Sequence, residues 1–123
     1  MVDASRRGRV LVVEDEALLA MHMIEVLESV GCEPIGPAMS TVTALPAALH
    51  EQIDAALLDV KLIDQSAKPI ADVLARRRIP FAFVTSCSRD ELPAPHRDQP
   101  LLAKPFNDDD LAAAIVDLIA KNV

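Results

Sequence analysis

Short, nearly unbroken runs of apolar residues recur along the chain, with polar segments between them. These runs are VLVV at 10–13, AALLD at 55–59, FAFVT at 81–85 and LLA at 101–103. A strand with one face in water alternates apolar and polar positions, whereas a parallel strand covered on both faces is apolar throughout. The runs therefore predict strands of a buried parallel sheet.

Two segments outside these runs have clear amphipathic helical spacing. In residues 17–30 the apolar side chains fall on one face, and Gly31 follows where a left-handed C-terminal cap usually lies. The chain ends in a second such segment, with Asn107 as the expected cap and aspartates at 108–110 that complement the helix dipole. The residues expected to face the core are Leu19, Met23, Val26, Leu27 and Val30 in the first helix and Leu111, Ile115, Leu118 and Ile119 in the last.

Two further segments are expected to be helical. One covers residues 41–52, with Ser40 or Thr41 as its N-terminal cap, although Pro46 within it indicates a kink or a later start. The other covers residues 69–77 and begins with proline, which is favourable in a first turn because its missing N–H would have no partner there.

Prolines mark two less regular segments. EPIGPA at 33–38 fits an edge strand, because proline has no N–H to donate to a neighbouring strand. In residues 88–99, Pro93 and Pro95 allow at most one or two helical turns.

The resulting alternation of strands and helices requires right-handed crossovers onto a parallel sheet. The sequence thus predicts an α/β fold with a five-stranded, doubly wound sheet and a short or irregular fourth helix.

Composition and charge favour one folded domain with a protein partner. The 123 residues are 51% hydrophobic but only 2% aromatic, so aliphatic side chains must fill the core. Residues 9–123 are expected to form the domain, and residues 1–8 a flexible N-terminal arm. With 12 Lys+Arg against 19 Asp+Glu, the net charge of -7 repels phosphate backbones and anionic lipids. Neither nucleic acid nor a membrane is therefore an expected partner.

Cysteine usage and the N-terminus favour a reducing compartment. Cys32 and Cys87 lie in unrelated contexts, without the spacing of a disulfide framework or a zinc site. There is no apolar signal segment, and no apolar run approaches the roughly 18 residues that a membrane span needs. The expected compartment is the cytoplasm.

Polar residues follow the predicted strands, and the carboxyl ends of strands are where ligands bind in such sheets. The residues at those ends are Glu14 and Asp15 after the first strand, Asp59 after the third, Thr85 and Ser86 after the fourth, and Lys104 after the fifth. Three carboxylates, a hydroxyl and a lysine are thus expected to meet at one rim.

The chemistry of this set points to a cation and a phosphoryl group. Clustered carboxylates repel one another unless a cation joins them, and Mg2+ prefers a few such oxygens with retained waters. Glu14, Asp15 and Asp59 therefore predict a Mg2+ site. Asp59 is then the expected nucleophile toward a phosphoryl donor, with Lys104 neutralising the transferred oxygens. Thr85 and the backbone N–H of the residue after it are expected to bond the new phosphate.

The motifs VVEDE, LLDVKL, FVTS and LLAKPF resemble the four signatures of response regulator receiver domains, spaced as in that family over nearly the whole chain. The resemblance implies a flavodoxin-like sheet with strand order 2-1-3-4-5. It makes Glu14 and Asp15 the metal acids, Asp59 the phosphoacceptor, Thr85 the switch hydroxyl and Lys104 the phosphoryl-binding lysine. It also implies a metal-binding backbone carbonyl at Lys61 and a cis bond between Lys104 and Pro105.

A narrower similarity is to the FAT GUY subfamily of single-domain receivers, which take part in stress and phosphorelay signalling. It rests on SAKPIADVLARRRIPFAFVTS at 66–86, the proline-rich stretch that follows, and LLAKPF. Their threonine is usually followed by glycine, whereas Ser86 and Cys87 follow Thr85 here. Leu101 also replaces the aromatic switch residue of typical receivers, and the chain has no Tyr. Coupling of the threonine to an aromatic side chain therefore cannot operate in the usual way.

The sequence thus predicts a stand-alone receiver, with no effector segment after residue 123. It accepts a phosphoryl group on Asp59 from a histidine kinase or phosphotransfer protein and signals by altered binding to a downstream protein partner. It is not expected to be an enzyme beyond assisting its own phosphorylation and slow dephosphorylation. Alternatives are a pseudo-receiver that works without phosphorylation, a receiver cut from a hybrid histidine kinase, and a phosphatase-like hydrolase. Such a hydrolase normally carries its nucleophile on the first strand, with a second Asp two residues on that is missing here.

Other charged residues receive simpler interpretations. The histidines are interpreted as solvated side chains rather than phosphotransfer residues: His22, His50 and His96. The arginines at 76–78 are interpreted as a charge cluster favoured by the helix C-terminus. Lys61 is expected to lie beside the carboxylate pocket and to place its ammonium there when metal is absent.

Overall fold

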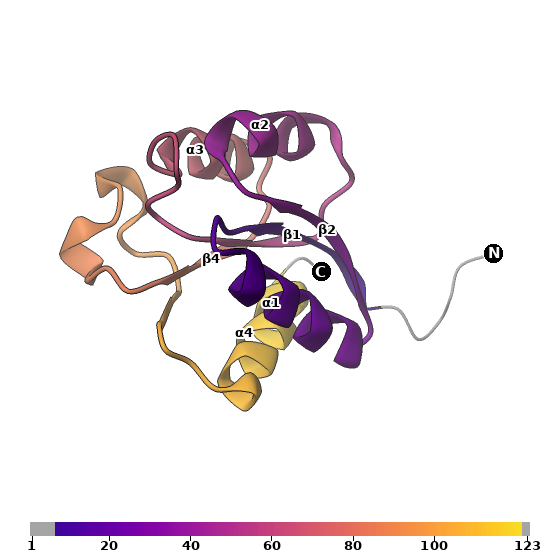
Figure 1. Ribbon diagram of the computed structural model, residues 1–123. Helices are drawn as coiled ribbons and strands as arrows, with labels where there is room; N and C mark the ends of the chain where they lie inside the picture. The colour runs from indigo at the N-terminus through magenta and orange to yellow at the C-terminus, as the bar shows by residue number, and fades with distance from the viewer. Residues whose placement is uncertain (1–6, 122–123) are drawn as a thin grey trace.

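The computed structural model describes residues 7–121 (Figure 1). Its strands are β1 Gly8–Val13, β2 Cys32–Ala38, β3 Ala55–Leu58, β4 Phe81–Thr85 and β5 Leu101–Ala103. Its α-helices are α1 Ala17–Ser29, α2 Thr41–His50, α3 Lys68–Arg76 and α4 Asp108–Lys121. Residues 1–6 of the expected N-terminal arm lie outside the described part, and Gly8 is already the first residue of β1.

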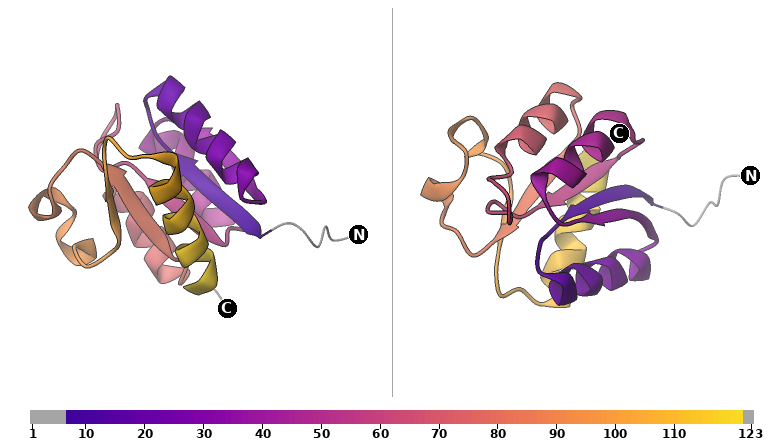
Figure 2. Two further views of the ribbon diagram at one scale, coloured as in Figure 1. Left: turned by 90° about the horizontal axis from the view of Figure 1, so that it is seen from below. Right: turned by 45° about the horizontal axis from the view of Figure 1, so that its top comes forward.

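The five strands form one parallel sheet in the order β2-β1-β3-β4-β5, which confirms the predicted fold class and strand order. Helices α2 and α3 cover one face, and α1 and α4 cover the other (Figures 1 and 2). Successive residues of β1 alternate between the two cores, with Leu11 and Val13 on the α2/α3 side and Val10 and Val12 on the α1/α4 side. Both sides are apolar, which explains the unbroken apolar runs in the sequence.

The predicted ends of α1 and α4 are confirmed by their backbone geometry. Gly31 follows α1 with a φ of 85°, the left-handed conformation that glycine adopts without a steric penalty. At the start of α4, the Asn107 side-chain oxygen accepts a hydrogen bond of 2.8 Å from the Asp110 N–H. Most of the residues expected to face the core are buried, while Leu19, Val30 and Ile119 are half-buried.

Helix α2 begins at Thr41 despite Pro46, so the alternative of a later start is wrong. The Ser40 hydroxyl accepts a bond of 3.1 Å from the Thr43 N–H, and the Thr43 hydroxyl accepts one of 3.2 Å from the Ser40 N–H. This reciprocal capping box fixes the first turn ahead of the proline. Pro46 therefore removes one hydrogen bond from the exposed side of a helix that has already started.

Strand β2 lies at the sheet edge, as its prolines predicted. Its pairing with β1 shifts register between Leu11 and Val13, opposite Gly36 and Pro37. Gly36 has a φ of 103°, and a Cβ there would lie 2.7 Å from the Ala38 nitrogen and 2.9 Å from the Val12 oxygen. Only glycine fits this irregularity, because the backbone of β1 and β2 approaches too closely for a side chain.

Residues 88–99, here called the β4–β5 segment, form only two short 3-10 turns, Arg89–Glu91 and Ala94–His96, as the prolines predicted. The expectation that His96 is solvated is wrong, because this side chain is only 6% exposed. Its Nε2 lies 2.6 Å from Asp72 Oδ1 on α3, and its ring meets the Phe81 ring edge-on at 5.7 Å. A buried ring with one polar partner and one aromatic neighbour anchors the segment to the domain.

Arg77, which directly follows α3, contacts the end of a neighbouring helix. Arg77 donates from Nη2 to the Glu51 carbonyl at 2.9 Å and from Nη1 to the Ala48 carbonyl. These carbonyls belong to the last turn and cap of α2, which otherwise lack helical partners. The guanidinium thus joins α3 to the C-terminus of α2, where the helix dipole favours a positive charge.

None of the described helices is long and apolar enough to cross a membrane. Cys32 is buried and Cys87 half-buried, and both are free thiols, as expected from their spacing.

Stability should depend on pH through Asp72. Hydrogen bonds from Lys68 and His96 lower the pKa of Asp72. A carboxyl with a lowered pKa stabilises the folded state above its unfolded-state pKa, and the contribution disappears as pH falls through the folded-state pKa. We therefore expect Asp72→Asn to reduce the free energy of unfolding at pH 7, and the difference from wild type to shrink below about pH 4. Urea unfolding at both pH values measures this, with the exposed Asp117→Asn as control. A difference that stays constant with pH would contradict it.

Candidate functional site

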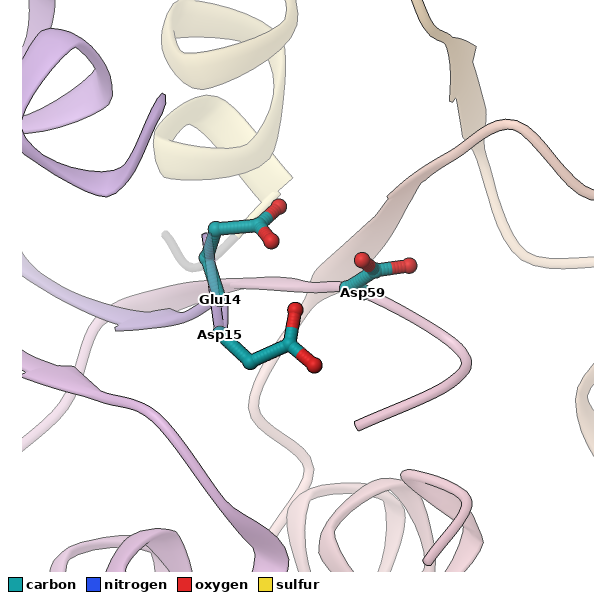
Figure 3. A group of neighbouring side chains, drawn as sticks. All are labelled: Glu14, Asp15 and Asp59. Carbon is teal, nitrogen blue, oxygen red and sulfur yellow. The ribbon is translucent and has the colours of Figure 1, made fainter. Parts of the chain in front are cut away.

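Three carboxylates meet at the carboxyl ends of two neighbouring strands (Figure 3). Glu14 and Asp15 directly follow β1, and Asp59 directly follows β3. One oxygen from each of the three lies within 4.8 Å of the others. The structure therefore brings together the acidic residues that the sequence predicted as a cation site.

Backbone hydrogen bonds between strand ends bring these residues to the same level of the sheet. The Asp59 N–H donates to the Val13 carbonyl at 3.0 Å, at the end of β1. The Lys104 N–H donates to the Thr85 carbonyl at 2.9 Å, so the residue after β5 is held beside the end of β4. The sheet hydrogen bonding that aligns the strands thus also aligns the site.

The Lys104 ammonium lies between two of the carboxylates. Its Nζ is 2.7 Å from Glu14 Oε1 and 2.9 Å from Asp59 Oδ2. Glu14 is only 1% exposed, and its Oε1 has no aligned hydrogen-bond donor, so the ion pair with Lys104 is what compensates this oxygen. The other Glu14 oxygen accepts a bond of 3.1 Å from the Glu16 N–H. Removal of the lysine would leave a buried charge without compensation.

The pKa values of this pair reflect burial and mutual attraction. Burial raises the pKa of Glu14 above its ordinary value, while the ion pair with Lys104 and the hydrogen bond from the Glu16 N–H oppose this rise. Burial alone would lower the pKa of Lys104, but its close contacts with the Glu14 and Asp59 carboxylates outweigh burial and raise it. Lys104 is therefore held in its charged form at neutral pH.

The donor set fits a hard divalent cation. Three carboxylates with oxygens this close supply the ligand type that Mg2+ prefers, and their partly open side leaves room for retained waters. The expected ammonium from Lys61 is not in this pocket: its side chain is 72% exposed, with Nζ 3.9 Å from Glu91 Oε1. Lys104 is the cation that reaches the carboxylates, because the loop after Asp59 directs Lys61 outward.

Thr85 and Ser86 continue the rim beyond Asp59. Thr85 is buried, and its hydroxyl oxygen accepts a bond of 3.1 Å from the Cys87 N–H, while Ser86 is exposed. Leu101, at the position of the usual aromatic switch, pairs with Phe83 in the sheet and is half-buried. The threonine therefore closes a local turn and has no aromatic switch beside it.

A pocket of about 420 Å³ adjoins the site, between α1 and the loop that joins β5 to α4, and no local pattern in the sequence indicates it. Lys104 and Ser86 line one side. His22 lines the other side; it is 43% exposed, as expected of a solvated side chain, and its Nε2 lies 2.6 Å from Asp108 Oδ1. The peptide bond between Lys104 and Pro105 is cis, as the resemblance implied.

Comparisons with known proteins agree with this geometry. No family model matches the chain. A response regulator receiver domain protein (CheY-like) from Methanospirillum hungatei has the same fold, with a TM-score of 0.82, 22% identity and coverage of 93% of this chain and 94% of that one. SdrG from Sphingomonas melonis is 36% identical, with 98% of both chains covered and a TM-score of 0.75. The BeF3-activated conformation of SdrG from Pseudomonas melonis is 39% identical, with 95% and 99% covered and a TM-score of 0.74.

The curated relatives are longer. The transcriptional regulatory protein PdtaR of Mycobacterium tuberculosis is 35% identical over 117 residues, 92% of this chain and 57% of PdtaR. The phyllosphere-induced regulator PhyR of Methylorubrum extorquens is 31% identical, over 91% of this chain and 43% of PhyR. The chain spans about half the length of these relatives.

The sheet order and the acidic cluster beside a lysine define the CheY-like receiver class of fold and site. With similarity to SdrG over nearly the full length of both chains, this protein belongs to the response regulator receiver family of two-component signalling. Members of this family are phosphoacceptors rather than classical enzymes.

Loss of the Lys104 ammonium should destabilise the metal-free protein. We expect Lys104→Ala to lower the free energy of unfolding by about 2–3 kcal/mol in EDTA, because Glu14 and Asp59 then face each other without a cation. Added Mg2+ should stabilise the variant more than wild type, since no ammonium competes for the carboxylates. Urea unfolding with and without Mg2+ measures both effects, with exposed Lys121→Ala as control. Equal stabilisation of variant and wild type by Mg2+ would exclude this competition.

Proposed function

We propose that this protein is a receiver that accepts a phosphoryl group on Asp59 from a histidine kinase or phosphotransfer protein and signals by altered binding to a downstream protein. The observation that carries the proposal is the position of the Asp59 carboxylate. It lies among Glu14, Asp15 and Lys104, at the end of a central strand. Both oxygens of Asp59 are oriented: Oδ1 accepts from the Val60 N–H at 2.7 Å, and Oδ2 is held by Lys104.

In the proposed transfer, one Asp59 oxygen attacks the phosphorus of the donor. An O–P bond forms, the P–N bond to the donor imidazole breaks, and its electron pair returns to the ring nitrogen. The Lys104 ammonium is already within hydrogen-bond distance of Asp59, so a small movement brings it to a phosphoryl oxygen. Thr85 and the Ser86 backbone N–H are the proposed donors to the remaining oxygens.

Glu14, Asp15, Asp59 and the Lys61 backbone carbonyl are the proposed ligands of Mg2+. A bound Mg2+ supplies positive charge beside the transferred oxygens. The protein's own part is to hold the three carboxylates at the rim and to keep Lys104 charged next to them. Asp15 is more exposed than the other two and is therefore the acid that incoming solvent and ions reach first.

The proposed readout is a rearrangement of the backbone after Thr85. The Thr85 hydroxyl oxygen now accepts from the Cys87 N–H, and a rotation of this side chain toward a phosphoryl group on Asp59 would break that bond. The turn at 86–88 is then free to change, and the β4–β5 segment follows directly. Because Leu101 supplies no aromatic switch, this route does not depend on ring rotation.

The relatives support a protein partner. A solved structure of the anti-anti-sigma factor PhyR from Bartonella quintana is 28% identical, over 92% of this chain and 48% of that one. We place this protein with the FAT GUY single-domain receivers and take a regulatory protein of that kind of pathway as its downstream partner. A pseudo-receiver that works without phosphorylation is the second candidate, and the oriented Asp59 carboxylate beside Lys104 argues against it.

The acceptor is tested by Asp59→Asn. The amide keeps the shape of the carboxylate but loses its nucleophilic charge, so this variant should fold and incorporate no phosphate from acetyl phosphate or a cognate kinase. Phosphate-affinity gels and intact mass measure the product, and Asp117→Asn should react like wild type. Stable label on Asp59→Asn would assign the acceptor to another residue.

The readout is tested by amide hydrogen exchange with and without beryllofluoride and Mg2+. We expect the largest change in protection at residues 85–97, because Thr85 leaves its bond to the Cys87 N–H when it bonds the phosphoryl mimic. Lys104→Ala should still bind or accept the group to some degree but show a smaller change. Changes elsewhere in the domain with none at 85–97 would refute this route.

A further inference from the structure

The loop that follows the proposed phosphoacceptor has an ordered backbone of its own. Residues 60–67, here called the β3–α3 loop, are closed at the base by a bond of 2.8 Å from the Ala67 N–H to the Val60 carbonyl. Lys61 and Ser66 pair as an antiparallel bridge, and the Leu62 N–H donates to the Gln65 carbonyl at 3.1 Å. The loop is thus a small hairpin that begins at the site and projects away from it.

The tip of this hairpin is attached to α2 by one carboxylate. Asp64 accepts from the Thr41 N–H at 2.9 Å through Oδ1 and from the Val42 N–H at 3.0 Å through Oδ2. These are the first two N–H groups of the helix, which have no partner within it. Backbone hydrogen bonds, with that of Thr41 the largest, lower the pKa of Asp64. A second link, from the Thr41 hydroxyl to the Ser66 carbonyl at 3.0 Å, lies next to the first.

Helix α2 does not depend on Asp64 alone for its cap. Ser40 already satisfies the N–H of the third residue, Thr43, through the capping box. Asp64 and Ser40 therefore cap the same helix end from different parts of the chain. Only Asp64 belongs to the β3–α3 loop. A substitution at Ser40 therefore affects the helix end alone, whereas one at Asp64 affects both the helix end and the loop.

The base of the loop is in direct contact with the site. The Val60 N–H donates to Asp59 Oδ1 at 2.7 Å, so the backbone at the base of the loop helps to orient the Asp59 carboxylate. Val60 is in turn held by its carbonyl, which accepts from Ala67. A displacement of the hairpin therefore changes the orientation of the Asp59 carboxylate.

We propose that Asp64 is a positioning residue for the cation and phosphoryl site, acting through the β3–α3 loop on the Asp59 carboxylate. The inference rests on the proposed function, because it concerns how that site is kept ready for Mg2+. Asp64 itself is exposed. Its effect is to fix the loop to α2 before the cation arrives, so that less order has to be gained on binding.

The test compares Mg2+ binding to four purified proteins by NMR titration of backbone amides: wild type, Asp64→Ala, Asp64→Asn and Ser40→Ala. We expect Asp64→Ala to weaken Mg2+ binding about three- to tenfold, less than the usual loss for a residue that contacts a metal ligand directly. Asp64→Asn keeps an oxygen for the Thr41 N–H and should fall between wild type and Asp64→Ala. Ser40→Ala weakens the same helix end but should bind Mg2+ like wild type.

A second measurement does not depend on metal. In EDTA, amide exchange at residues 60–67 should be faster in Asp64→Ala than in Ser40→Ala, although urea unfolding shows both to be folded. Unchanged Mg2+ affinity in Asp64→Ala, or an equal loss in Ser40→Ala, would overturn the positioning role while leaving the proposed function in place. Failure of wild type to bind Mg2+ would instead overturn the proposed function, and the inference with it.

Discussion

The charge balance at the ends of β1 and β3 is the constraint on which the rest of the structure depends. Glu14 is almost fully buried and Asp59 nearly so, and their negative charges are compensated by one ammonium, that of Lys104. Lys104 reaches them only because β5 pairs with β4 and the backbone after β5 is bonded to Thr85. The edge strand β5 is thus coupled electrostatically to the centre of the sheet. Loss of the β4–β5 pairing would remove Lys104 and leave the carboxylates without their compensating charge.

Much of the fold was predictable from the sequence because its signals are local. The apolar runs, Gly31 after α1 and Asn107 before α4 each express their structure within a few residues. The acidic cluster was also predictable, since the carboxyl ends of parallel strands lie along one edge of the sheet. The burial of His96 was not predictable, because its partner Asp72 lies 24 residues away and only the folded chain brings them together. Which lysine places its ammonium among the carboxylates, Lys61 or Lys104, was not predictable either. It depends on the direction of the hairpin after Asp59, which no local pattern in the sequence encodes.

Helix α2 shows how little of a helix's stability needs to come from its own residues. It contains Pro46 and three β-branched residues in its first turn, Thr41, Val42 and Thr43, all poor helix formers. Both ends are completed from elsewhere: Asp64 supplies negative charge at the N-terminus and Arg77 positive charge at the C-terminus. The signs match the helix dipole, so α2 is stabilised as a bridge between the loop after the acceptor and the end of α3.

The β4–β5 segment has a consequence for how such a domain diversifies. Of residues 88–99, only Leu92 and His96 are buried. Apart from Glu91, which faces Lys61, the rest is bonded within the segment: Arg89 donates to the carbonyls of Arg97 and Gln99, and Arg97 donates to that of Asp90. A surface element attached at two points and internally bonded can change its length or exposed residues without disturbing the pairing of β4 with β5. Its exposed residues can therefore be replaced, or a new sequence inserted among them, at little cost to folding.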